Sequence, residues 1–305
     1  MNQDVLFRSD SPINLEGYTD VDWTDCPDLR RSITGRIPRE FGILSFFVSL
    51  DLGSNNFHGN LPQEMAHLHR LKFLDLSFNN FRGAIPSWFG FLHQLQVINI
   101  RNNSFTGSIP SSFSNMSTLE TLNLNFNSID GQIPKVIASL INLRELSGLP
   151  ILKGLYLSKN KLRGHMPTSL SNCSQLQILS LSKNEFDEPI HSEIGRLSNL
   201  QLLYLGTNHF TGIIPQEIEN LANLVELWME GNQITGSVPI SIFNISSLQI
   251  LSLWKNNLSG FLPQEIGNLS KMQILQLSGN KLIGEIPKEI SNLVELEELL
   301  LADNS

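Results

Sequence analysis

The stretch that decides the fold is Leu197–Pro215, which reads LSNLQLLYLGTNHFTGIIP. Its leucines lead to Asn208, then to a phenylalanine and a Gly-Ile-Ile-Pro run, and the same order of residue types recurs along the chain. All but one of the intervals between the recurring asparagines are 24 residues. A fixed period in this range indicates a solenoid in which each repeat is one turn of chain. The recurring residues are Asn55, Asn79, Asn103, Asn127, Asn160, Asn184, Asn208, Asn232, Asn256, Asn280 and Asn304.

A Leu-x-Leu segment, such as Leu203-Tyr204-Leu205, precedes each asparagine in the regular repeats. Side chains alternate across a strand, so the two leucines face one side and the residue between them faces the other. No single repeat can bury such a face alone, and stacked turns are needed to build a shared core. We therefore predict one short strand per repeat and a parallel sheet formed by stacking them.

The asparagines from Asn55 to Asn280 are predicted to form a structural ladder. Each amide carries two donors and an acceptor, and all of them must be bonded when the side chain is buried. A ladder that ties the loop backbone of neighbouring turns, about 4.8 Å apart, would bond them. The glycine that follows permits a backbone bend and the proline ends local hydrogen bonding, so we expect a bend after each asparagine.

The repeated pattern LxxLxxLxLxxNxFxGxIPxxI resembles the plant-specific class of leucine-rich repeats, found in extracellular parts of receptor-like kinases, receptor-like proteins and cell-wall inhibitors. The resemblance implies an α/β repeat fold: a right-handed leucine-rich repeat solenoid with a parallel β-sheet on its concave face and short 3-10 helices and loops on its convex face. It also implies that ligands or co-receptors bind the concave face and the flanks. Within the family, the chain is most similar to the immune receptor kinases that sense flagellin and elongation factor.

Residues 1–35 do not follow the repeat, and we expect them to be disordered or poorly packed. Residues 17–35 resemble the start of the ribonuclease H region of copia-type retrotransposon polyproteins, with Asp20 where that family has its first metal-binding carboxylate. Such chemistry needs several convergent acids, and the chain turns to repeats before they occur. The alternative is a degenerate repeat cap that keeps Trp23 and Cys26 but lacks the partner cysteine. We expect no catalysis from this segment.

Residues 36–305 are predicted to form one domain of about 11 repeats. The leucine pattern is irregular over residues 140–155, where either one turn has an insertion or two turns are shortened. The displaced glycine and proline around Asp187–Ile190 predict a distorted outer bend. The chain stops at Ser305 within a repeat, which is how a truncated protein ends.

The net charge of −8 argues against a nucleic-acid partner, which would require a basic face. Cys26 and Cys173 are too many repeats apart to form a disulfide. The sequence as written has neither a signal peptide nor an apolar run long enough for a membrane span, so a membrane link would need segments outside this chain. The family resemblance still implies the plasma membrane or the extracellular space. Candidate N-glycosylation sequons support this location: Asn102, Asn115, Asn172, Asn244, Asn257 and Asn268.

Candidate binding residues are the outward ones, six, four and two residues before each asparagine. Aromatic side chains cluster there at Tyr204, Trp228 and Trp254, and the strand spacing predicts that their rings are in contact. Exposed Trp and Tyr residues often anchor interfaces, although a self-packed aromatic patch without a partner is the alternative. We expect Arg101, Glu226 and Glu230 to add polar specificity. The predicted ligand-binding surface on the concave face comprises Tyr156, Tyr204, Trp228, Glu230, Trp254 and Arg101.

No catalytic motif is present: the sequence has no phosphate-binding loop, kinase catalytic loop or Gly-x-Ser-x-Gly elbow. We also expect no metal site and no cofactor. The sequence therefore favours a non-enzymatic recognition module, the ectodomain fragment of a plant leucine-rich repeat receptor-like kinase that perceives extracellular immune or developmental signals. Its partners would be a peptide or protein ligand and possibly a leucine-rich repeat co-receptor. The alternatives are an inhibitor of cell-wall hydrolases and a functionless truncated or chimeric gene product.

Overall fold

The computed structural model describes residues 34–135, residue 137 and residues 151–305. The segment that resembles a retrotransposon polyprotein lies outside the described residues, apart from its last two positions. Most of the irregular stretch over 140–155 also lies outside them. The fold below is therefore that of the repeats on both sides of this stretch.

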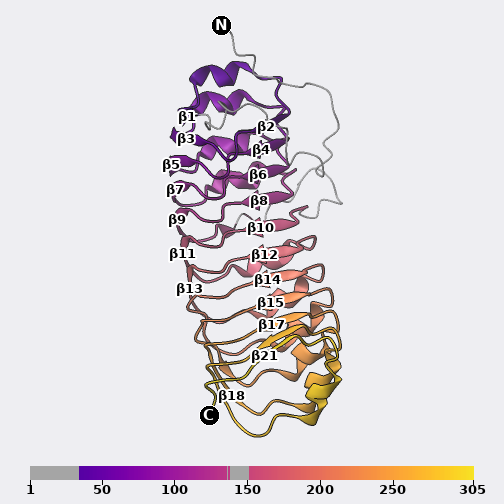
Figure 1. The fold of residues 1–305 in the computed structure, drawn as a ribbon. Helices are drawn as coiled ribbons and strands as arrows, with labels where there is room; N and C mark the ends of the chain where they lie inside the picture. Colours follow the sequence, from indigo (N-terminus) through magenta and orange to yellow (C-terminus); the bar gives the residue numbers. More distant parts are fainter. Residues whose placement is uncertain (1–33, 136, 138–150) are drawn as a thin grey trace, which may run out of the picture.

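The predicted parallel sheet is confirmed. Eleven strands of the described chain stack in sequence order along the solenoid (Figure 1). Every turn pairs with the next in the same register, so that Leu203 lies between Leu179 and Leu227. The strands are β2 (Ser49–Asp51), β4 (Phe73–Asp75), β6 (Val97–Asn99), β8 (Thr121–Asn123), β10 (Gly154–Tyr156), β12 (Ile178–Ser180), β14 (Leu202–Tyr204), β15 (Glu226–Trp228), β17 (Ile250–Ser252), β19 (Ile274–Gln276) and β21 (Glu298–Leu300).

The core lies behind this sheet. Leu203 and Leu205 are fully buried, as are their equivalents in the neighbouring turns. Deeper in each turn an apolar residue, phenylalanine in five turns and isoleucine or leucine in the others, follows the asparagine, and the rings of Phe186 and Phe210 stack 6.1 Å apart. Because each buried residue has a copy of itself above and below, the core is continuous along the solenoid.

The segment after the asparagine is a strand in most repeats, which the sequence analysis did not predict, and the glycine that follows makes the expected backbone bend at positive φ. In β3 (Asn56–Gly59) exposed and buried residues alternate, with Phe57 in the core, and Gly59 ends the strand at φ 88°. The strand forms because the asparagine of the next turn accepts a hydrogen bond from its backbone. The other strands of this row are β1 (Thr34–Gly35), β5 (Asn80–Ala84), β7 (Ser104–Gly107), β9 (Ser128–Gly131), β11 (Lys161–Gly164), β13 (Glu185–Phe186), β16 (Thr235–Gly236), β18 (Asn257–Gly260) and β20 (Lys281–Leu282).

This second row is interrupted between β13 and β16, at the place where the sequence predicts a distorted bend. Glu188 has φ 63°, and an isolated bridge joins Pro189 to Thr211 in place of a longer pairing. A proline cannot donate a ladder hydrogen bond, so the row ends here. The result is a seven-stranded sheet before the interruption and a three-stranded sheet after it.

The side opposite the eleven-stranded sheet is built from short 3-10 helices, as predicted. Each described helix has five residues and follows a proline, except η7, which follows His191. The fixed φ of proline favours this start. The helices are η1 (Arg39–Ile43), η2 (Gln63–His67), η3 (Ser87–Phe91), η4 (Ser111–Asn115), η6 (Thr168–Asn172), η7 (Ser192–Arg196), η8 (Gln216–Asn220), η9 (Ile240–Asn244), η10 (Gln264–Asn268) and η11 (Lys288–Asn292).

Asparagine side chains join the turns along one flank. Asn208 Nδ2 donates to Leu205 O at 3.0 Å in its own turn and to Leu181 O at 3.1 Å in the preceding turn. Its Oδ1 accepts a hydrogen bond of 3.1 Å from the Phe186 N–H. The same pattern recurs at Asn79, Asn103, Asn127, Asn160, Asn184, Asn232, Asn256 and Asn280. Asn55 Nδ2 donates to Leu52 O and Gly53 O within its own turn.

Candidate functional site

A small polar and aromatic cluster occupies the outward face of β14 and β15. The Tyr204 hydroxyl donates to Glu226 Oε2 at 2.8 Å, and Trp228 Nε1 donates to the same oxygen at 3.0 Å. Burial and the neighbouring Glu226 carboxylate raise the pKa of Tyr204 above its usual value, so the hydroxyl keeps its proton. A single carboxylate oxygen thus fixes both rings on adjacent turns.

Glu230 lies beside this cluster without a hydrogen-bond partner for one of its oxygens. Its carboxylate packs across Gly206, where any side chain would collide with it. Glu230 Oε2 is buried and unbonded. Burial raises the pKa of Glu230, although its own backbone N–H and the charge of Lys183 act in the opposite direction. An unpaired buried carboxylate oxygen is costly, and Arg101 Nε is the other buried atom without a hydrogen-bond partner among the predicted binding residues.

These side chains line an open, shallow depression of about 300 Å³, hereafter the strand-face pocket. Gly206, Ser158 and Ser182 were missed by the sequence analysis. All three lie two residues before an asparagine, as Glu230 does, and their small size leaves the space into which the larger groups project. The sequence does contain a signal for the pocket: small residues occupy the position two before the asparagine in three consecutive repeats. The lining residues are Ser158, Ser182, Tyr204, Glu226, Trp228 and Glu230.

The other predicted aromatic residues do not line this pocket. Tyr156 lies over Gly154 on β10, and burial raises the pKa of its hydroxyl. Trp254 carries the Lys255 ammonium 4.3 Å above its ring centroid. The sequence predicted that the rings of Tyr204 and Trp228 contact each other. In the structure, the two side chains are joined by hydrogen bonds to the same Glu226 oxygen.

Arg101 lies far along the face from the strand-face pocket. Its guanidinium carbon is 5.4 Å from the Phe78 ring centroid and 4.8 Å from that of Phe126, and Lys159 Nζ lies 4.1 Å from the Phe126 centroid. The sequence analysis did not single out these phenylalanines. Both phenylalanines occupy the position directly before an asparagine. Their own backbone is left-handed, with φ 52° at Phe78 and φ 58° at Phe126. This backbone conformation turns the ring onto the flank beside Arg101.

Four of the six sequon asparagines lie exposed at the end of a 3-10 helix: Asn115, Asn172, Asn244 and Asn268. Asn102 is exposed on the flank, and Asn257 is half-buried at the start of β18. Five of these side chains are therefore accessible from solvent.

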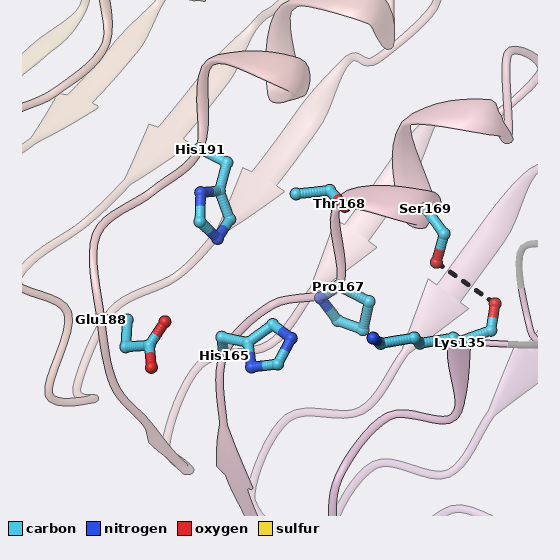
Figure 2. Close-up of a pocket in the computed structure, with 7 residues that line it drawn as sticks. All are labelled: Lys135, His165, Pro167, Thr168, Ser169, Glu188 and His191. Atoms are coloured by element: carbon cyan, nitrogen blue, oxygen red, sulfur yellow. Dashed lines mark hydrogen bonds between the residues drawn. The ribbon is translucent and has the colours of Figure 1, made fainter.

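A second depression lies away from the strand face, where the seven-stranded sheet ends. It has a volume of about 400 Å³ and is lined by Lys135, His165, Pro167, Thr168, Ser169, Glu188 and His191. Figure 2 shows the imidazoles of His165 and His191 and the Glu188 carboxylate around one opening, with the Ser169 hydroxyl bonded to the Lys135 carbonyl. No three metal-binding side chains in the described part of the chain could hold a metal ion. In that same part, every helix is too short or too polar to cross a membrane.

Cys173 is a buried free thiol at the end of η6. Burial raises its pKa to about 11, so the thiol stays protonated and unreactive at neutral pH. Cys26 lies outside the described residues.

Comparison with solved structures identifies plant receptor ectodomains. The chain is 34% identical to a TDR receptor over 90% of this chain and 46% of that one, with a TM-score of 0.85. It is 32% identical to the plant peptide hormone receptor RGFR1 in complex with RGF2, over 90% and 50% of the two chains, with a TM-score of 0.72. The Arabidopsis receptor kinase HAESA, in complex with the peptide hormone IDA and the co-receptor SERK1, is 28% identical over 90% and 60%, with a TM-score of 0.50. The chain thus spans about half the length of the first two receptor chains.

Family comparison gives a consistent result, although no curated protein matches the chain. The leucine rich repeat family matches residues 76–129, 93–147 and 244–305. A second leucine rich repeat family matches residues 152–173, 199–221 and 223–245, and the two together span more than half of the sequence. The stacked strands, the 3-10 helices and these matches show that the chain belongs to the leucine-rich repeat family.

Proposed function

We propose that this chain is the ligand-recognising part of a plant receptor of the leucine-rich repeat class and that it binds a peptide on the outward face of the eleven-stranded sheet. The observation that carries the proposal is the strand-face pocket, where Tyr204 and Trp228 are held by one carboxylate on adjacent strands. Aromatic residues fixed in this way give contact area at little entropic cost, which is why Tyr and Trp dominate binding hot spots. The likeness to receptors solved with bound peptides supports the same assignment.

The proposal includes a site of action and a second partner. The similar solved structures include a plant peptide hormone receptor and a receptor kinase, and we place this chain at the outer surface of the plasma membrane, linked through segments outside it. The HAESA complex contains the co-receptor SERK1 together with a peptide. A leucine-rich repeat co-receptor that contacts the bound peptide is therefore the proposed second partner.

The test is selection of binding peptides from a random dodecapeptide display library against the 305-residue chain. Peptides that bind should lose at least about tenfold in affinity for Trp228→Ala, since a hot-spot aromatic contributes at least 1.4 kcal/mol. The control is Phe261→Ala, because Phe261 is 66% exposed and lies away from the strand-face pocket. Peptides whose affinity depends on Phe261 and not on Trp228 would contradict the proposed function.

A further inference from the structure

We propose that the strand-face pocket binds one cationic group of a peptide ligand, the ammonium of a lysine or of an amino terminus or the guanidinium of an arginine. This inference rests on the proposed function and names the chemistry of the ligand. It follows from three properties of the pocket: its unpaired charge, its unoccupied aromatic residues and its size.

The first property is the charge. Glu226 and Glu230 both line the pocket. The ion pairs of the described residues are Arg39–Glu64 and Lys153–Glu120, so neither pocket carboxylate is part of one. Glu226 Oε2 is bonded by Tyr204 and Trp228, but Glu230 Oε2 has no donor. A cation in the pocket would pair with the Glu230 carboxylate, and an apolar or anionic ligand would leave this carboxylate unpaired.

The second property is the state of the aromatic rings. Elsewhere on this face and its flank, the chain places its own cations against rings: Arg101 against Phe78 and Phe126, and Lys255 against Trp254. None of the cation–ring contacts in the described repeats involves Tyr204 or Trp228. No cation of the described chain therefore lies against these two half-buried rings, and the adjacent carboxylates would strengthen the binding of a cation from outside.

The third property is the size. An open depression of about 300 Å³ has room for one side chain of a ligand. Ser158 and Ser182 add hydroxyl groups that can accept hydrogen bonds from the remaining N–H donors of a cation. Lys183 lies near enough to lower the pKa of Glu230, yet it makes no ion pair with that carboxylate. Among the described residues, no cationic side chain of the chain itself forms an ion pair with the pocket carboxylates in place of the ligand.

The experiment is an NMR titration of the 305-residue chain that follows the indole N–H signal of Trp228, assigned with Trp228→Phe. The probes are the capped tripeptides Ac-Ala-X-Ala-NH₂, with X as lysine, arginine or norleucine, and uncapped Ala-Ala-Ala-NH₂. Lysine or arginine should bind at least about tenfold more tightly than norleucine, which has nearly the same shape as lysine without its charge. Binding of the uncapped peptide alone would assign the site to an amino terminus and also supports the inference.

Two variants test whether the preference comes from Glu230. Glu230→Gln keeps the shape and removes the charge, so the preference for a cation should disappear. Gly206→Ala keeps the charge and displaces the carboxylate, because the new methyl group would overlap it, and it should also reduce the preference. Glu217→Gln in η8 is the matched control and should retain it. The inference would be overturned if norleucine bound to the unmodified chain as tightly as the lysine, arginine and uncapped probes, or if Glu230→Gln kept the full preference.

The outcomes separate this inference from the proposed function. If display-selected peptides depend on Trp228 but show no charge preference, the inference fails and the proposed function stands. If the lysine or arginine probe binds through Glu230 while peptide selection yields no Trp228-dependent binder, the cation pocket stands and peptide recognition fails.

Discussion

The asparagine flank and the strand face differ in how they treat hydrogen-bonding groups. On the flank, Asn208 bonds both ends of its amide, and its copies in other turns do the same. On the strand face, each turn has different residues at the outward positions, and Glu230 Oε2 is left unbonded. The flank repeats from Asn79 to Asn280 because stacking requires it, whereas the strand face is free to vary because no strand or helix of the described residues covers it. Changes on the flank and in the core should therefore alter stability, and changes on the strand face should alter binding.

The largest effect is expected in the core. Leu203→Ala should lower the free energy of unfolding by about 2–5 kcal/mol, because it opens a cavity between Leu179 and Leu227. Urea unfolding followed by circular dichroism measures the change. Ile213→Ala is the control, since Ile213 is 62% exposed and should change stability by no more than about 0.5 kcal/mol. Equal losses for the two variants would refute the repeat core as the source of stability.

The next effect should be on the flank. Asn208→Ala should cost about 1–3 kcal/mol, because it removes the acceptor of the Phe186 N–H and the donor to Leu181 O. The matched control is Asn223→Ala, which removes one exposed bond to Ser198 O and should cost less than about 1 kcal/mol. Peptide affinity should be the same in both variants wherever the chain is folded. If Asn208→Ala were as stable as the control, the ladder would not hold the turns together.

A smaller effect should appear at alkaline pH through Cys173. Its pKa is raised to about 11 in the folded chain from an ordinary value of 9.0. Between these values the unfolded thiol has lost its proton and the folded thiol has kept it. The contribution of the buried neutral thiol to the free energy of unfolding is therefore fully present below pH 9 and decreases as the pH rises toward the folded pKa. The slope should be about 1.4 kcal/mol per pH unit at most. Unfolding of the unmodified chain and Cys173→Ala at pH 8 and pH 10 measures it, and parallel curves would show that the thiol is not buried.

The smallest effect should be on the strand face, where a substitution should stabilise the folded chain at neutral pH. Burial raises the pKa of Glu230, so the folded chain is favoured when this carboxyl is protonated. That stability is present below the ordinary pKa of the carboxyl and is lost as the pH rises through the folded value. The Glu230→Gln variant should therefore have the same stability as the unmodified chain at pH 4 and should be slightly more stable than it at pH 7. Thermal unfolding at the two pH values tests this, and a loss of stability at pH 7 would mean that Glu230 already has an internal partner.

The sequence predicted the strand layer because its cause is local and recurs, and the family resemblance implied the helix layer. The alternation in Leu203-Tyr204-Leu205 requires one buried face, and the 24-residue spacing stacks that face on its copies. The second row of strands was not predicted. It depends on the Asn79 side chain, which bonds the backbone of Phe57 in the preceding turn. Such a bond between turns is visible only when the turns are placed together.

The candidate site shows the same division. Tyr204, Trp228 and Glu230 could be placed on the strand face from their distance to an asparagine, since register decides which side of a strand a residue occupies. Arg101 satisfied the same rule, but the structure places it between Phe78 and Phe126, away from the other candidates.

The sequence by itself therefore determined the period, the buried leucines, the asparagine positions and the outward residues of each strand, because a repeat fixes these by spacing alone. The tertiary structure decided which outward residues act together: Glu226 joins Tyr204 to Trp228, and Glu230 lies across Gly206. The physical reason is that side-chain partners on this face come from neighbouring turns. Their distances depend on rotamers and on the empty space above a glycine, which the spacing of residues along the chain does not specify.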